Sequence, residues 1–192
     1  MSLQLDRHGW LKPGRGVSLT PSPNFNERPR GMAVSLLVIH NISLPPGELG
    51  GPHVENLFCN RLDYEAHAWF ECLRGLRVAA HFFVRRDGAV QQFVATDKRA
   101  WHAGVSRLHE REGCNDFSLG VELEGTDVLP YTDEQYATLG RLTVALKARY
   151  PLTHAWGHEH IAPGRKTDPG PAFDWQRFGA MCGFLRRSLP PG

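Results

Sequence analysis

The sequence lacks a charge excess of either sign and any long apolar run, and both absences exclude classes of partner. It has 22 Lys and Arg residues against 20 Asp and Glu residues, and the basic residues occur as scattered pairs with no stripe. Nucleic acid is therefore not expected as a partner, because its recognition needs a concentrated basic surface. Residues 1–16, MSLQLDRHGWLKPGRG, contain neither an apolar signal core nor a segment long enough to span a membrane. We therefore expect a cytoplasmic protein with no membrane partner.

Cysteine is also sparse. The four cysteines form no CxxC pair and have no regular spacing, so we expect small buried thiols and no disulfide bonds. Repeats, low-complexity tracts and linkers are absent too, and the 41% of residues that are hydrophobic suffice for one core. We expect a single domain over residues 1–192, with an N-terminal arm or loop at 1–31 and a catalytic core at about 33–188.

Short strands and amphipathic helices are present in alternation. Strands are expected at 33–39, 78–84, 89–94, 118–123 and 152–156, where apolar and β-prone runs lie between turn signals. An Asp-Gly pair between the second and third of these indicates a β-hairpin.

Three helical regions are expected. One or two short helices lie within 54–74, and a longer helix follows the capping box formed by Thr132 and Gln135 and ends before Pro151. A last helix follows the N-cap Asp174. Its expected buried side consists of Phe178, Met181, Cys182 and Leu185. The predicted fold class is α/β (α+β), a central mixed β-sheet flanked by helices.

The stretch GHEHIAPGRKTDPGPAFDW, residues 157–175, carries the residues best suited to chemistry. Its prolines and glycines exclude a helix through it and restrain the loop. Imidazole and carboxylate groups such as those of His158 and Asp168 bind zinc, and the ammonium of Lys166 can stabilise a developing negative charge. The two ligand types lie ten positions apart, which fits no local chelating pattern. A metal site therefore needs a third ligand from elsewhere in the chain.

Two other strands also carry polar groups. His40 is expected at the end of the first strand, where the backbone is rigid and the side chain can reach a cleft. Glu122 and Glu124 project to one face of their strand and need a polar destination.

Six segments together resemble the zinc-dependent N-acetylmuramoyl-L-alanine amidases, most closely the cytoplasmic 1,6-anhydro-N-acetylmuramyl-L-alanine amidases of the AmpD type. The segments are VIHNISLPPG, RVAAHFFVRRDGAVQQFV, RAWHAG, CNDFSLGVELEGTD, YTDEQY and HIAPGRKTDPGPAFDW. They cover most of residues 38–178 in the family's order. The resemblance implies a mixed sheet flanked by helices, as in phage lysozyme-type amidases and peptidoglycan recognition proteins, one zinc ion, and a small muropeptide as substrate in cell-wall recycling.

The resemblance also implies roles for individual residues. The zinc ligands fall on His40, His158 and Asp168, and the catalytic glutamate and lysine fall on Glu122 and Lys166. The family's substrate-binding positions fall on Arg77, Asn41 and Trp101. Three protein ligands leave one tetrahedral position open for a water, whose pKa zinc lowers to about 7. The glutamate would move that water's proton, the lysine would face the oxyanion, and the arginine would bind a stem-peptide carboxylate.

Each role has a structural alternative. His40 on its own is more typical of a hydrogen-bonded strand histidine, Glu124 competes with Glu122, and either glutamate can be an ion-pair partner. Lys166 beside Arg165 can be a solvated pair, and Trp101 can be a packing residue. The remaining histidines with no supporting pattern, expected to be structural or exposed, are His53, His67, His81, His109 and His154.

Two departures from the family pattern remain. His160 follows a ligand by two positions, where the family more often has a small or acidic polar residue. It can be a group that contacts the metal ligands, an adventitious metal binder, or a residue with no role. Gly113 replaces an arginine, for which Arg111 can compensate.

Two other functions stay open. One is a broader, exported peptidoglycan amidase, and the other is a muropeptide-binding module of the same fold without catalysis. Oligomeric state cannot be derived from the sequence.

Overall fold

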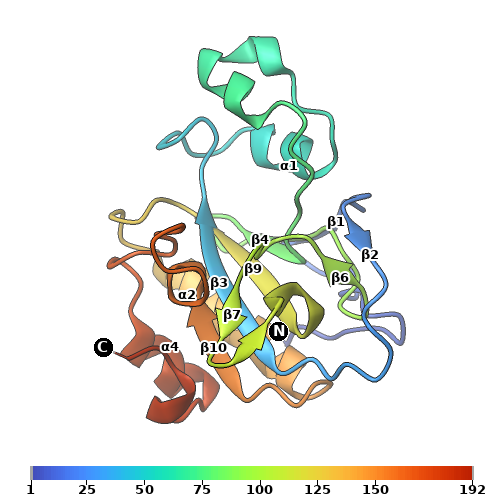
Figure 1. Cartoon of the computed structure of the whole chain (residues 1–192), viewed down its shortest axis with the longest axis vertical. Helices are drawn as coiled ribbons and strands as arrows, with labels where there is room; N and C mark the ends of the chain where they lie inside the picture. Colours follow the sequence, from blue (N-terminus) through green and yellow to red (C-terminus); the bar gives the residue numbers. More distant parts are fainter. Residues whose placement is uncertain (1, 192) are drawn as a thin grey trace.

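A six-stranded mixed sheet lies at the centre of the molecule (Figure 1). The computed structural model describes residues 2–191. The strands, in chain order, are β1 (Val17–Leu19), β3 (Leu36–Ile42), β4 (Phe82–Val84), β5 (Val90–Gln92), β9 (Ser118–Glu124) and β10 (His154–Gly157). Their spatial order is β1-β5-β4-β9-β3-β10. Strands β4, β9, β3 and β10 are parallel, whereas β4 and β5 form the predicted antiparallel hairpin. The mixed sheet is confirmed.

Helices cover the sheet. They are α1 (His53–Phe58), α2 (Asp133–Lys147), α3 (His158–Ile161) and α4 (Trp175–Cys182), with 3-10 helices η1 (Tyr64–Ala66), η2 (Ala68–Leu73), η3 (Cys114–Asp116) and η4 (Arg186–Ser188). The predicted capping box starts α2: the Thr132 hydroxyl accepts from the Gln135 N–H, and the Gln135 side chain accepts from the Thr132 N–H. Figure 1 shows α1, η1 and η2 grouped at the end of the sheet toward which β3 runs.

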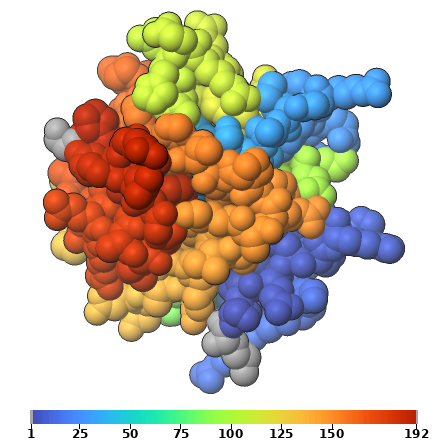
Figure 2. Space-filling model, turned by 90° about the horizontal axis from the view of Figure 1, so that it is seen from below, coloured from blue at the N-terminus to red at the C-terminus, as the bar shows by residue number. Residues whose placement is uncertain are grey.

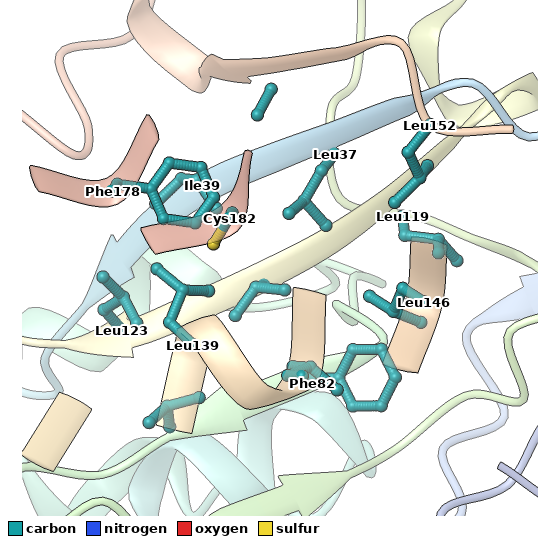
Figure 3. Packing of buried hydrophobic residues seen from close by; sticks show 14 of the residues in the cluster. Leu37, Ile39, Phe82, Leu119, Leu123, Leu139, Leu146, Leu152, Phe178 and Cys182 are labelled. Atoms are coloured by element: carbon teal, nitrogen blue, oxygen red, sulfur yellow. The ribbon is translucent and has the colours of Figure 1, made fainter. Parts of the chain in front are cut away.

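The main hydrophobic core fills the space between one face of the sheet and helices α2 and α4 (Figure 3). Side chains alternate along a strand, so Leu37 and Ile39 of β3 and Leu119 of β9 point to this face. Leu139 of α2 and Phe178 of α4 meet them from the other side. All five side chains are buried.

The opposite face of the sheet has two smaller cores. Leu36 and Val38 of β3 pack with Phe117 and Ile161, and a separate cluster that includes Phe83 lies beneath α1 and η2. Because alternation places residues 36, 38 and 40 on one face, the next side chain of β3 on this face is that of His40.

The N-terminal segment is more regular than the predicted arm. β1 is one of the two edge strands of the sheet, and β2 (Phe25–Asn26) pairs with β6 (Arg99–Ala100). Later in the chain, a further hairpin joins β7 (Arg107–Leu108) to β8 (Arg111–Glu112). In Figure 2 the blue N-terminal segment lies beside the orange surface near the end of α2. There the Arg149 guanidinium donates to the Asp6 carbonyl at 2.7 Å.

Four predictions about local structure were wrong. The first strand begins later and continues through His40 to Ile42. A helical turn, α3, forms inside the stretch from which helix was excluded, because five residues separate Gly157 from Pro163, the next breaker, and the Ala162 N–H closes the turn on the His158 carbonyl at 2.9 Å.

The last helix stops at Cys182, since Gly183 adopts φ +65° as a left-handed C-cap. As a result Leu185 lies outside the helix and is exposed. Met181 lies inside the helix but is 43% exposed, so it is not on the buried side either. Of the cysteines expected to be buried, Cys72 is exposed and Cys59 is half-buried. No helix within residues 2–191 is both long and apolar enough to cross a bilayer.

Candidate active site

Neighbouring parallel strands deliver the site residues to one edge of the sheet. His40 lies in β3 and is the register partner of Glu122 in β9. His158 immediately follows β10, whose last residue pairs with the β3 residue before His40. The carboxyl ends of parallel strands are where open sheets place ligand sites. Asp168 comes from the following loop, where its carbonyl accepts from the Glu159 N–H at 2.8 Å.

Three ligand atoms converge at this edge. His40 Nδ1 lies 3.0 Å from His158 Nδ1 and 3.0 Å from Asp168 Oδ2, and His158 Nδ1 lies 3.1 Å from the same oxygen. These atoms form a group that can hold a metal ion. Ligand atoms around a tetrahedral zinc lie roughly 3.3 Å apart, so the spacing suits one small metal ion. The structure brings together all three residues that the sequence predicted as ligands.

Burial sets the protonation of this group. Desolvation, with the neighbouring His158, lowers the pKa of His40 to about 4. Burial raises the pKa of Asp168, but the close contacts of its carboxylate with the imidazoles of His158 and His40 outweigh it and leave that pKa below its ordinary value. At neutral pH the group therefore offers a neutral His40 imidazole and an ionised carboxylate, the forms that bind metals.

Glu122 is a buried carboxylate beside this group. It is 9% exposed, and its Oε2 has no hydrogen-bond partner among the described residues. Burial raises its pKa well above the ordinary value, the charge of Asp168 adds to the increase, and Lys166 opposes it. An unpaired buried carboxylate oxygen is costly and is found at functional sites.

Glu124 is engaged elsewhere although it shares the face of the strand. Its carboxylate accepts from the Gly50 N–H at 2.7 Å and from the Arg86 N–H at 3.0 Å, and it lies 3.5 Å from Arg85. The geometry therefore favours Glu122 over Glu124 as the group available for chemistry.

A groove of about 450 Å³ opens over these residues. Its lining includes the remaining predicted site residues, namely Lys166, Arg77, Asn41 and Trp101, together with His158 and Asp168. Apolar side chains of η2, including Trp69 and Leu73, form another part of the lining. The groove therefore presents charged and apolar surface next to the ligand atoms.

Two of the lining residues also hold the structure together. Asn41 Nδ2 donates to Asp127 Oδ1 at 2.8 Å and to the Pro169 carbonyl at 3.1 Å, which fixes the loop beside Asp168. The indole N–H of Trp101 donates to Asn26 Oδ1 at 2.9 Å.

The two departures from the family pattern lie outside the ligand group. The His160 ring lies between Trp156 and Trp175, with centroids 6.1 Å and 5.8 Å away. Arg111 lies over the Phe117 ring at 3.6 Å and is not in the groove lining, so it does not replace the missing arginine there.

Sequence reasoning missed the residues behind the ligands. His102 Nδ1 lies 2.9 Å from His40 Nε2, and the Ala103 carbonyl lies 3.1 Å from His158 Nε2. A Trp-His pair carries no local signal for such a role. The contact joins residues 62 positions apart, so only the fold reveals it.

A model of the N-acetylmuramoyl-L-alanine amidase family matches residues 30–171. The chain belongs to this family. The 1,6-anhydro-N-acetylmuramyl-L-alanine amidase AmpD of Citrobacter freundii is 56% identical over 90% of this chain and 92% of its own. A crystal structure of a selenomethionine AmpD derivative is similar at a TM-score of 0.87 and 54% identity, covering 92% of this chain and 98% of that one.

A more distant member of this amidase fold has been seen with a ligand. AmpDh3 from Pseudomonas aeruginosa, in complex with anhydromuramic pentapeptide, has a TM-score of 0.55 and 26% identity, over 86% of this chain and 66% of that one. The family, the fold and the amidase class predicted from the sequence are thereby confirmed.

Proposed function

We propose that this amidase uses one zinc ion to hydrolyse the amide bond between the lactyl group of 1,6-anhydro-N-acetylmuramic acid and the L-alanine of the stem peptide. The observation that carries the mechanism is the unpaired Glu122 carboxylate beside three converging ligand atoms. The substrate follows from the activity named for the Citrobacter freundii relative and from the pentapeptide bound by AmpDh3. The reaction would serve cytoplasmic recycling of the cell wall.

The donor set fits zinc. His40, His158 and Asp168 offer two imidazole nitrogens and one carboxylate oxygen, a combination that zinc accepts with its fourth position open. The unpaired Glu122 oxygen beside them leaves an acceptor free for a group bound there. When bound, zinc polarises a carbonyl and lowers the pKa of a water.

Glu122 is proposed to move the proton of the reaction. Its raised pKa suits a group that takes a proton from the attacking water and later returns it to the leaving amine nitrogen. No other carboxylate with an unpaired buried oxygen lies within the described residues.

Lys166 and Arg77 are proposed to bind charge on the substrate. Lys166 lines the groove. It follows Arg165, whose guanidinium donates to the carbonyls of Ala103 and Val105. The charge of Lys166 can stabilise the oxyanion that forms when the amide carbonyl is attacked. Arg77 lines the same groove and suits a stem-peptide carboxylate, which guanidinium binds in a bidentate manner. Asn41 and Trp101 are the proposed contacts for the rest of the substrate.

The experiment presents two substrates to the zinc-loaded protein, anhydro-muramyl tripeptide and intact sacculi, and follows free peptide by mass spectrometry. The proposal expects intact tripeptide from the soluble substrate and little release from sacculi. Efficient release from sacculi would instead indicate the broader exported amidase, and binding of the soluble substrate without release would indicate a recognition module. Cell fractionation tests the cytoplasmic location separately.

A further inference from the structure

A chain of buried contacts extends behind His40, away from the ligand group. While Nδ1 faces His158 and Asp168, Nε2 lies 2.9 Å from His102 Nδ1. The other nitrogen of His102, Nε2, lies 3.2 Å from the hydroxyl of Ser118. His40, His102 and Ser118 are all buried, so water does not compete for these contacts.

The direction of these hydrogen bonds decides whether His40 can bind a metal. A ligand nitrogen needs a free lone pair, so the proton of neutral His40 must be on Nε2 and point at His102 Nδ1. His102 must then carry its own proton on Nε2 and donate it to Ser118. If His102 instead carried its proton on Nδ1, His40 Nε2 would have to accept that hydrogen bond. The proton of neutral His40 would then be on Nδ1, the nitrogen that faces the metal.

The second ligand histidine is oriented by the adjacent residue. His158 Nε2 lies 3.1 Å from the Ala103 carbonyl, which can only accept, so the proton of neutral His158 is fixed on Nε2 and its Nδ1 is left free. The backbone N–H groups of His102 and Ala103 both donate to Asn115 Oδ1, at 3.2 Å and 2.8 Å. The two-residue segment of His102 and Ala103 therefore contacts the Nε2 atoms of both ligand histidines.

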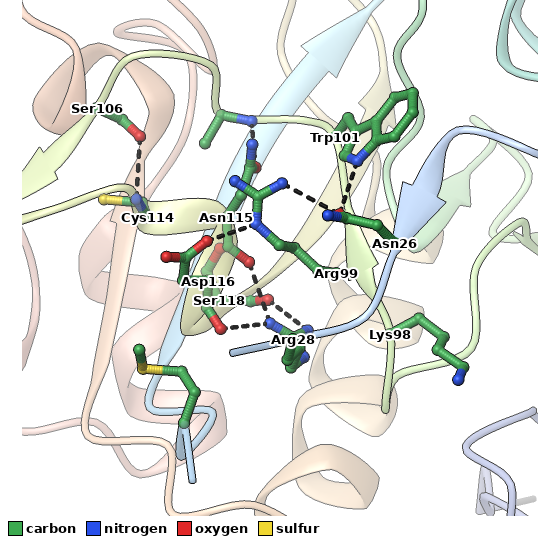
Figure 4. A network of polar contacts seen from close by, with 12 residues as sticks. Asn26, Arg28, Lys98, Arg99, Trp101, Ser106, Cys114, Asn115, Asp116 and Ser118 are labelled. Carbon is green, nitrogen blue, oxygen red and sulfur yellow. Dashed lines mark hydrogen bonds and ion pairs between the residues drawn. The ribbon is translucent and has the colours of Figure 1, made fainter. Parts of the chain in front are cut away.

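Asn115, which binds that segment, is stabilised in turn by Arg28 (Figure 4). The guanidinium of Arg28, which contacts η3, donates to the carbonyls of Asn115, Asp116 and Ser118 at 2.8 to 3.1 Å. Figure 4 shows Asn115 and Ser118 beside Arg28, with the dashed contacts converging on its guanidinium.

Strand β9 makes room for the His102 ring. A Cβ on Gly120 would lie 2.6 Å from both Cγ and Nδ1 of His102, which is closer than real contacts allow. The Gly120 N–H donates to His81 Nδ1 at 3.0 Å, and this contact ties β9 to the residue that precedes β4.

We propose that His102 is a positioning residue for His40. Ser118 fixes the direction of the hydrogen bond between the two histidines by accepting a hydrogen bond from the His102 Nε2–H. Together His102 and Ser118 hold His40 in the tautomer that leaves Nδ1 free for the metal. This inference rests on the metal site of the proposed function and adds the residues that set its affinity.

The test measures zinc affinity of the full chain by competition with a chromophoric chelator. Ser118→Ala removes the acceptor without touching a ligand, and loss of an outer partner of this kind typically weakens metal binding about tenfold or more. Ser22→Ala is the matched control, because Ser22 is equally buried and its hydroxyl hydrogen-bonds Phe58 and Asn24, outside the ligand group. The control should lose stability but keep the zinc affinity of the wild type.

A double-mutant cycle separates positioning from a general structural effect. In His102→Asn the side-chain oxygen takes the place of Nδ1 and accepts from His40 without help from Ser118. Adding Ser118→Ala to that variant should therefore change zinc affinity much less than it does in the wild type. If Ser118→Ala does not fold, His102→Asn is compared with His102→Leu, and only the leucine variant should bind zinc weakly.

The outcomes are distinct. Wild-type affinity in Ser118→Ala, or the same loss in both backgrounds, overturns the inference. For the fallback pair, equal affinity in the asparagine and leucine variants overturns it. A wild type that binds no zinc contradicts the proposed function itself, and with it the site on which the inference depends.

Discussion

His40 and Glu122 are register partners on the adjacent parallel strands β3 and β9, so their side chains lie next to each other on one face of the sheet. The pairing extends over seven residues of each strand, from Leu36 with Ser118 to Ile42 with Glu124. A candidate ligand and a candidate acid–base group are thus spaced by the sheet itself and not by a loop.

Glu122→Gln should abolish most of the activity and leave the metal in place. The amide cannot take or return a proton, so kcat should fall by roughly a hundredfold to ten-thousandfold. Zinc content, measured by elemental analysis, should match that of the wild type because Glu122 is not in the ligand group. Glu124→Gln is the control: its amide keeps one acceptor oxygen and loses the other, so one of the hydrogen bonds from Gly50 and Arg86 is lost and the unfolding free energy should fall by about 1–3 kcal/mol while kcat changes little.

The same carboxyl group should make the metal-free protein less stable as pH rises. The folded state raises the pKa of Glu122 above its ordinary value of 4.5, so above that pH the folded state binds more protons than the unfolded state. Its contribution to the unfolding free energy therefore decreases with increasing pH. Glu122→Gln should be more stable than the wild type at about pH 8, with a smaller advantage at about pH 5, in urea titrations with chelator present. An advantage that is constant or shrinks with pH would refute the burial of this charge.

Gly120→Ala should disturb the metal site indirectly, by displacing the His102 ring that contacts His40. The new methyl group would meet the His102 ring at 2.6 Å, so the unfolding free energy should fall by about 1–3 kcal/mol and zinc affinity should fall with it. Gly140→Ala in α2 is the matched control, because the nearest neighbour of the new methyl group is the terminal carbon of the Met181 side chain at 3.2 Å, and alanine favours a helix by about 1 kcal/mol. Unchanged zinc affinity in Gly120→Ala would mean that the His102 ring can move without disturbing the ligands.

Arg77→Lys should raise KM for a substrate with a free stem-peptide carboxylate, roughly tenfold, with kcat little changed. Lysine keeps the charge but loses the bidentate fork. Arg74→Lys serves as the control, since Arg74 pairs with Glu65 and Glu71 and does not line the groove. An equal effect of Arg77→Lys on a substrate whose carboxylate is amidated would show that Arg77 does not bind that group.

Local chemistry made much of the fold predictable. The capping box at Thr132 and Gln135 involves residues three positions apart and appears in the structure as predicted. The Asp-Gly pair likewise produces the β4–β5 hairpin. Motif order, in turn, identified the three residues whose ligand atoms converge.

The failures have physical causes of two kinds. Gly183 carried a local C-cap signal that ended α4 before Leu185, and α3 fits between Gly157 and Pro163 because breakers act only at their own positions. By contrast, the contacts of His102 with His40 and Ser118 depend on how loops and strands pack, and no spacing in the sequence encodes them.

The most direct measurement is zinc content together with peptide release, in the wild type and in Asp168→Ala. Asp133→Ala is the control, since Asp133 is an exposed carboxylate paired with Arg177. The wild type and the control should each hold one zinc ion and release intact tripeptide from anhydro-muramyl tripeptide, whereas Asp168→Ala should bind zinc weakly and release none. Full activity of Asp168→Ala, or of the wild type after complete removal of zinc, would contradict the account.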